Sequence, residues 1–277
     1  MKEFFLYVYI KFRLFVDFLI KFNNNELKGI LKKSTLKKIK SSYSIDLPYS
    51  IGRTVRGVAF NNSLKDPYSK IVSDLLIGDS VVSITENLYS ICNEYKNSTV
   101  SEFIDSLSES KFKSLPLWAI VNPWESISVQ KSKESYLNSF YVNRSQNNLV
   151  FNNLSKSHIE SIIYSRDSAK SQVTQFNRLL KIILSKGYVQ NSNDLPTALI
   201  LVKENKWCWI MGHSGNHRAH IFKEIGYLNL RCKIAGIVEY NNLSNCKNVL
   251  NGDYTLNQAK LFFERAFNGK NPIRGPI

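Results

Sequence analysis

The fold is decided by the stretch PTALILVKENKWCWIMGHSGNHRAHIFKEIGYLNLRCKIAGIV, residues 196–238. Its first part holds two short apolar runs, 196–202 and 207–211, on either side of the turn sequence Glu-Asn-Lys. Two apolar runs joined by a short polar turn are typical of neighbouring antiparallel strands. We therefore predict a β-hairpin over residues 196–211.

A helix and a further strand follow the hairpin. The helix is predicted to begin after Gly215 and to end at Gly226, because apolar residues recur between these glycines at helical spacing. The apolar run at 230–238 predicts the strand. Upstream, QFNRLLKIILSK at 175–186 has one apolar face and ends before Gly187, so we predict another helix there.

The junction between the hairpin and the helix has the features of a phosphate site. Gly212 and Gly215 let the backbone approach a ligand closely. The free N–H groups at a helix start, and the positive end of its dipole, favour an anion. Arg218 can hold two phosphate oxygens, while His217 can donate a hydrogen bond to them or carry a proton. The junction therefore predicts phosphate binding.

The segment SGNHRAHIFKEIG at 214–226, with the elements on either side of it, resembles the ParB/sulfiredoxin superfamily. The resemblance covers roughly residues 159–240. Members of this superfamily carry a Gly-x-(His/Arg)-Arg turn at the start of a helix, and that turn binds nucleotide phosphates. The resemblance implies an α+β fold whose C-terminal domain has a small mixed sheet and helices. Before this domain we expect a mostly helical N-terminal region.

The resemblance also implies the residues of a site. Arg166, in YSRDS, resembles the arginine that precedes the helix in the family's first sequence box. We expect His217 and Asp167 to be catalytic, with Asp167 as the base because it adjoins Arg166 near the expected phosphate site. Asp167 can equally be the N-cap of the helix that follows it. The expected nucleotide-binding residues are Arg166, Gly212, Ser214, Gly215, Asn216 and Arg218.

Three departures from the family narrow the function. Asn216 stands where sulfiredoxins have a catalytic cysteine, which excludes the repair of sulfinic acids. Ser214 stands where the small-molecule serine kinases have an aspartate, which puts their acid–base arrangement in doubt. Partition ParB proteins have Glu-Arg at Asn216 and His217 and continue into a helix-turn-helix domain. The roughly forty residues after Val238 are too few for that domain and a dimerisation domain.

Residues 1–22 are the most hydrophobic stretch, but charges interrupt it too often for a transmembrane helix or a signal peptide. Most of these charges share one side of a helical wheel, which predicts an amphipathic helix. Six lysines and one acid then lie between residues 26 and 40. This pattern fits a peripheral anchor on an anionic membrane, and it fits equally a helix packed on the protein's own core before a solvated linker.

We predict three parts of the chain. Residues 1–40 are the amphipathic helix with its basic linker, and residues 41–150 are a region whose fold the sequence leaves undetermined. The ParB/sulfiredoxin-like domain is expected over residues 151–277. The boundary follows from the polar stretch at 132–153, which is rich in Asn and Ser.

Composition favours an anionic partner. The 277 residues include 37 Lys and Arg against 22 Asp and Glu, a net charge of +15. Nucleic acid, anionic lipid and a phosphorylated small molecule all fit this excess. Four cysteines without a CxxC pair predict neither a disulfide framework nor a thiolate zinc site, so we expect the reducing cytoplasm.

Three histidines, His213, His217 and His220, lie within eight residues and raise the alternative of a metal site. No Cys, Asp or Glu lies within this cluster to complete a tetrahedral set of ligands. The phosphate turn explains His217 without a metal. We therefore expect no metal ligands among these residues.

Two classes of function remain open. The first is a nucleotide-binding protein, with ATP or another nucleotide and Mg²⁺, that transfers a phosphoryl group to a small acceptor or hydrolyses it. The alternative is a ParB-like nucleic-acid-binding or nuclease protein, or a non-catalytic module bound to the membrane surface through residues 1–40. The position of the phosphate turn ranks a nucleotide before nucleic acid. The expected location is the cytoplasm, including the membrane periphery.

Overall fold

The structure is a computed structural model. It describes residues 44–55, 57–60, 66–94, 99–103, 121–125, 128, 131, 165–187, 194–212 and 214–270. The predicted amphipathic helix and basic linker at 1–40 therefore lie outside the described residues, as does the polar boundary at 132–153. None of the described helices combines the length and the apolar character that a membrane crossing requires.

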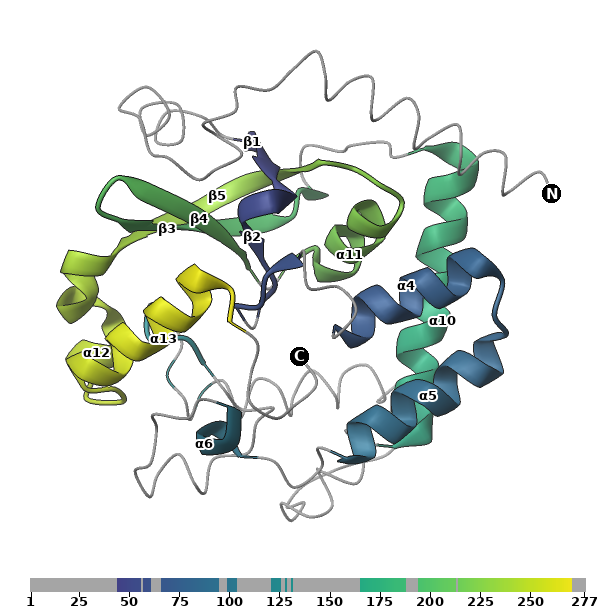
Figure 1. Ribbon diagram of the computed structural model, residues 1–277, viewed down its shortest axis with the longest axis horizontal. Coiled ribbons are helices and arrows are strands. Elements are labelled where there is room, and N and C mark those ends of the chain that lie inside the picture. Colours follow the sequence, from purple (N-terminus) through teal and green to yellow (C-terminus); the bar gives the residue numbers. More distant parts are fainter. Residues whose placement is uncertain are drawn as a thin grey trace.

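A five-stranded mixed sheet forms the centre of the fold (Figure 1), in the order β1-β5-β3-β4-β2. The strands β1 and β5 are antiparallel, as are β3 and β4, whereas β3 with β5 and β2 with β4 are parallel. The strand bounds are Ser44–Pro48 for β1, Gly52–Arg53 for β2, Thr197–Lys203 for β3, Lys206–Met211 for β4 and Asn229–Glu239 for β5. The mixed sheet with helices confirms the α+β class.

The stretch at 196–238 folds as predicted. The strands β3 and β4 form the hairpin, in which Lys203 pairs with Lys206 and Glu204 turns the chain at a φ of 54°. The helix α11 (Asn216–Glu224) follows, and the chain then returns as β5 alongside β3. The connection from β4 through α11 to β5 therefore places the start of α11 beside the start of β3.

Three helices form a layer that packs against α11. They are α4 (Pro67–Ile77), α5 (Val81–Glu94) and α10 (Arg166–Lys186), and Figure 1 shows α4 and α5 crossing α10. The helix α10 begins nine residues before the predicted start at Gln175. Its N-cap is Ser165, whose hydroxyl accepts from the N–H of Ser168 at 3.1 Å. Asp167 lies in the first turn instead of capping the helix.

The remaining elements are short or lie near the C-terminal end. The helix α13 carries a complete capping box between Thr255 and Gln258, which fixes its start. The bounds are Tyr49–Ile51 for η1, Val100–Phe103 for α6, Tyr240–Asn245 for η6, Lys247–Leu250 for α12 and Leu256–Asn268 for α13.

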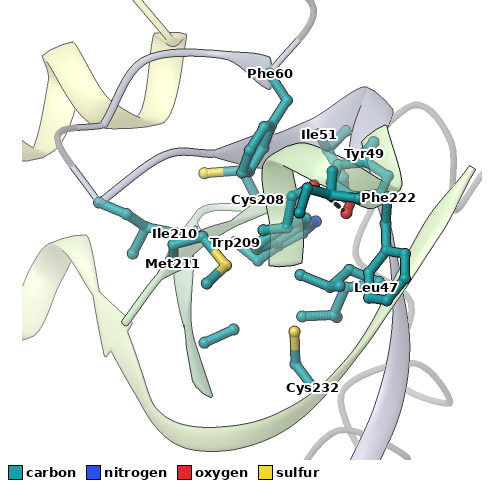
Figure 2. Packing of buried hydrophobic residues seen from close by; sticks show 14 of the residues in the cluster. Leu47, Tyr49, Ile51, Phe60, Cys208, Trp209, Ile210, Met211, Phe222 and Cys232 are labelled. Carbon is teal, nitrogen blue, oxygen red and sulfur yellow. Dashed lines mark hydrogen bonds between the residues drawn. The ribbon is translucent and has the colours of Figure 1, made fainter. Parts of the chain in front are cut away.

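Aromatic side chains from distant segments fill the core beside the sheet (Figure 2). The ring of Phe60 lies 5.1 Å from that of Tyr49 and 5.5 Å from that of Trp209. The indole N–H of Trp209 donates to the carbonyl of Pro48 at 2.7 Å, so no buried donor is left unpaired there. A Cβ at Gly52 would lie 2.4 Å from Cζ2 of Trp209, which explains why this short strand needs a glycine.

A buried arginine joins the edge strand β2 to the end of α13. The guanidinium of Arg53 donates to the carbonyl of Ala266 at 2.8 Å and to that of Phe267 at 2.7 Å. A cation is stabilised at the carbonyl end of a helix. Burial lowers the pKa of Arg53 from its ordinary value, and the helix carbonyls replace the water that the side chain loses.

Residues on both sides of position 150 share this fold. The strands β1 and β2 are the two edges of a sheet whose inner strands come from residues 197–239. The helices α4 and α5 likewise pack on α10. The N-terminal region, expected to be mostly helical, thus supplies strands as well as helices to one common core.

A buried polar cluster fastens α4 to α11. Asp66 accepts from the N–H of Tyr68 at 3.1 Å and so caps α4, while its other oxygen lies 2.7 Å from Nδ1 of His220. Ser69 donates to the same carboxylate at 3.2 Å. The side chains of Asp66 and His220 are 5% and 1% exposed. Each polar group in this cluster therefore relies on the others for its partners.

We predict that Asp66→Ala destabilises the protein by about 2–4 kcal/mol, because it removes a helix cap and leaves buried polar groups without a partner. The variant loses the cap of α4 and leaves His220 and Ser69 without their shared acceptor. Chemical denaturation of the full chain measures this loss. The exposed Asp79 is the matched control, and Asp79→Ala should change stability by no more than about 0.5 kcal/mol. A loss below about 1 kcal/mol for Asp66→Ala would contradict the structural role of the cluster.

Candidate phosphate-binding site

The turn before α11 is held against the start of β3. The N–H of Gly212 donates to the carbonyl of Thr197 at 2.7 Å, and the N–H of Thr197 donates to the carbonyl of Ser214 at 3.2 Å. A Cβ at Gly212 would lie 2.3 Å from Oγ1 of Thr197. At Gly215 the φ is +88°, and a Cβ there would lie 2.6 Å from that of Pro196. Chain packing therefore accounts for both glycines without a ligand.

The start of α11 has no side-chain cap. Gly215 occupies the N-cap position, whereas Asp66, Ser165 and Thr255 cap α4, α10 and α13 with their side chains. The side-chain oxygen of Asn216 is buried and has no hydrogen-bond partner among the described residues. The first turn of α11 thus presents backbone donors and an amide side chain at the positive end of the helix dipole.

Arg218 lies beside this helix start and already holds a carboxylate. Its Nη1 donates to Oδ2 of Asp194 at 2.8 Å, its Nη2 donates to Oδ1 at 3.0 Å, and Nη1 also contacts the carbonyl of Asp194. The side chain of Arg218 is 12% exposed and that of Asp194 is 72% exposed. The guanidinium is therefore fixed by the protein, while its acidic partner faces solvent.

His217 lies on a different face of α11, packed against α10 and α4. Its Nε2 donates to Oε1 of Gln172 at 2.9 Å, and its ring lies 4.5 Å from that of Phe176 and 5.7 Å from that of Tyr68. Burial, and to a lesser degree the nearby His220, lowers the pKa of His217 to about 4. The imidazole is therefore neutral at pH 7 and offers no positive charge to a phosphate.

His220 and Glu224 continue the same face of α11. His220 meets Asp66, and Glu224 accepts from the hydroxyl of Ser73 on α4 at 3.1 Å. His217 and His220 belong to the histidine cluster that raised the alternative of a metal site, and their ring nitrogens contact different partners. The described residues contain no cluster of three or more His, Cys, Asp or Glu placed to hold a metal ion, and His213 lies outside them. The polar face is a helix–helix contact.

Arg166 and Asp167 begin α10, away from these contacts. The Nε of Arg166 lies 2.8 Å from a carboxylate oxygen of Glu86, and its guanidinium lies 5.0 Å above the ring of Tyr89 on α5. Asp167 is exposed in the first turn. In the described part of the chain, neither residue has a hydrogen bond or ion pair to α11. Arg166 and Arg218 thus hold carboxylates of different segments.

The structure therefore brings together only part of the expected site. Asp194 joins it from the segment before β3, although nothing in the sequence pattern singled this acid out. Its pairing with Arg218 spans 24 positions of the chain, so no local spacing could have indicated it. The expected site residues that gather at the start of α11 are Gly212, Ser214, Gly215, Asn216 and Arg218.

The cysteine side chains offer no reactive thiolate. All four, Cys92, Cys208, Cys232 and Cys246, are free thiols. Burial raises the pKa of Cys92 to about 11 and that of Cys208 to about 12. These thiols stay protonated at neutral pH, whereas a nucleophile or a metal ligand must be a thiolate.

Comparisons with protein families, with curated proteins and with solved structures gave no match to this chain.

We predict that stability falls as the pH is lowered through the range in which His217 titrates. The pKa of His217 is about 4 in the folded chain, against 6.5 ordinarily, so the unfolded chain binds the proton more readily between these values. The contribution of the neutral imidazole is complete above pH 6.5 and is lost as the pH falls toward 4. Between pH 7 and pH 5 this loss should be about 2 kcal/mol.

Denaturation of the native chain and of His217→Gln at both pH values isolates this contribution, because the other titrating groups are common to both proteins. The glutamine cannot take up a proton, so its stability should depend less on pH by about the same 2 kcal/mol. Equal pH dependence of the two proteins would show that His217 titrates normally in the folded chain.

Proposed function

We propose that this protein binds the phosphate groups of a nucleotide at the start of α11. The observation that carries the proposal is the fixed guanidinium of Arg218 beside an uncapped helix start, already holding a carboxylate through two parallel hydrogen bonds. A phosphate offers oxygens that the same fork can accept, and helix starts are common anion sites. The resemblance of residues 214–226 to the nucleotide-binding turn of the ParB/sulfiredoxin superfamily supports the same ligand.

The backbone donors of Gly215 and Asn216 would hold one phosphate, and Arg218 would neutralise its charge. ATP is the first choice of nucleotide and others stay open. Mg²⁺ prefers carboxylate and phosphate oxygens, so we expect the ion to accompany the nucleotide through its phosphates.

We propose nucleotide binding alone, without a catalytic step. Transfer or hydrolysis of a phosphoryl group needs a residue that orients or deprotonates the nucleophile. Asp167, the expected base, lies in the first turn of α10 without a described hydrogen bond or ion pair to α11. His217 is packed between α10 and α4. Neither of the expected catalytic residues therefore supports a catalytic step at this site.

We predict that Arg218→Ala weakens nucleotide binding by about 10- to 100-fold, the usual effect of losing hydrogen bonds to a charged group. Calorimetric titration with ATP, ADP, CTP and GTP, each with and without Mg²⁺, measures this change. Arg218→Lys keeps the positive charge but loses the two parallel donors of the guanidinium. Its nucleotide affinity should therefore lie between that of the native chain and that of Arg218→Ala.

Arg166→Ala is the matched control for Arg218→Ala. Like Arg218, Arg166 pairs with a carboxylate of another segment, but its partner Glu86 lies on α5. Its removal should therefore leave nucleotide affinity unchanged. Equal losses in the two variants would place Arg166 in the site and contradict the arrangement proposed here. If a folded Arg218→Ala protein binds the nucleotides as tightly as the native chain does, the proposed function is wrong.

Asp194→Ala should strengthen nucleotide binding. The carboxylate of Asp194 occupies the fork of Arg218 and must leave before a phosphate can enter. Because an exposed ion pair is worth about 0.5–1 kcal/mol, its removal should raise the affinity about two- to fivefold. The same titration measures the gain. A weaker affinity would show that Asp194 contacts the ligand or its Mg²⁺ instead of competing with it.

A further inference from the structure

The exposed face of α10 carries a strip of hydrogen-bond donors that the proposed nucleotide site does not use. Lys170, Arg178 and Lys181 are all exposed on this face. They lie within a sector of about 100° on the helix, together with the hydroxyl residues Ser171, Thr174 and Ser185. These six residues form the α10 basic stripe. From Lys170 to Ser185 it extends for about 22 Å at the rise of an α-helix.

The charge of this stripe is not balanced by the described residues. Lys170, Arg178 and Lys181 have no ion pair within the described ranges, whereas Arg166 is paired with Glu86. The single acid in the same sector is Asp167, which lies in the first turn, where it complements the helix dipole. Within the described ranges, the stripe therefore presents three cations without an ion-pair partner along one line.

We propose that the α10 basic stripe binds the phosphate backbone of a nucleic-acid duplex. Lysine, arginine, serine and threonine are the side chains that commonly contact backbone phosphates, and such contacts do not depend on base sequence. The stripe holds no aromatic side chain on which the bases of a single strand could stack. A rigid double helix therefore matches the stripe better than a single strand.

An anionic membrane is the competing partner and fits this face less well. A helix that lies on a membrane buries an apolar face among the lipid headgroups. The apolar face of α10 is already used inside the protein, where Val173, Phe176 and Leu180 are at most 4% exposed. Ile182, 43% exposed, lies at the border of the stripe. The stripe thus offers charge without an apolar surface to insert.

The test measures binding of the full chain to a short fluorescein-labelled DNA duplex by fluorescence anisotropy, over a range of salt concentrations. The stripe variant combines Lys170→Gln, Arg178→Gln and Lys181→Gln. The control variant combines Lys206→Gln, Lys247→Gln and Lys270→Gln, which removes the same charge from exposed lysines outside α10. Circular dichroism and the melting temperature check that both variants fold.

The stripe variant should bind the duplex at least about tenfold more weakly, and its salt dependence should fall by about 2 to 3 in the log–log slope. The control variant should lose less than about 1 in the same slope. Absence of duplex binding by the native chain, or equal losses in the two variants, would overturn the proposal.

Two further measurements distinguish duplex binding at the stripe from lipid binding at the stripe and from nucleotide binding at α11. Binding to vesicles that contain phosphatidylserine should be the same for the native chain and the stripe variant. If the stripe variant instead loses vesicle binding and keeps DNA binding, the stripe is a lipid surface and the proposal fails. Calorimetric titration with ATP should give the native affinity in the stripe variant, so failure at the stripe is distinguishable from failure at α11.

Discussion

The buried contact between Asp66 and His220 sets the position of α11, and with it the geometry of the candidate site. One carboxylate caps α4, accepts from Ser69 and meets His220, so the start of one helix is fastened to the middle of another. Both side chains are almost fully buried, which makes an unpaired alternative costly. A shift of α11 would leave several polar groups without partners at once.

The other faces of α11 depend on this anchor. The hydroxyl of Tyr49 donates to the carbonyl of Ala219 at 2.7 Å and ties the helix to the segment between β1 and β2. His217 and Glu224 continue the contact with α10 and α4. Arg218 is therefore left on the side that faces Asp194, next to the turn that leads out of β4. The same packing that buries the histidines presents the arginine to an anion.

Local patterns predicted the central elements, and long-range contacts decided the rest. The hairpin, α11 and β5 were predictable because glycines and apolar runs mark their bounds. The strand β2 has two residues and no periodic signal, and it exists because Trp209 packs on Gly52 and β4 pairs with it. The position of Gly215 and Arg218 at the start of α11 was predictable, because apolar spacing marks that helix. The buried state of His217 was not, since it depends on Gln172, 45 positions earlier.

The most direct test of the account is a nuclear magnetic resonance titration of the ¹⁵N-labelled full chain with ATP. Phosphate binding at a helix start changes the environment of the first backbone N–H groups. We expect the largest chemical-shift changes at the amides of Gly215, Asn216 and His217 and at the Nε of Arg218. Unchanged signals there, with shifts confined to other elements or absent altogether, would contradict it.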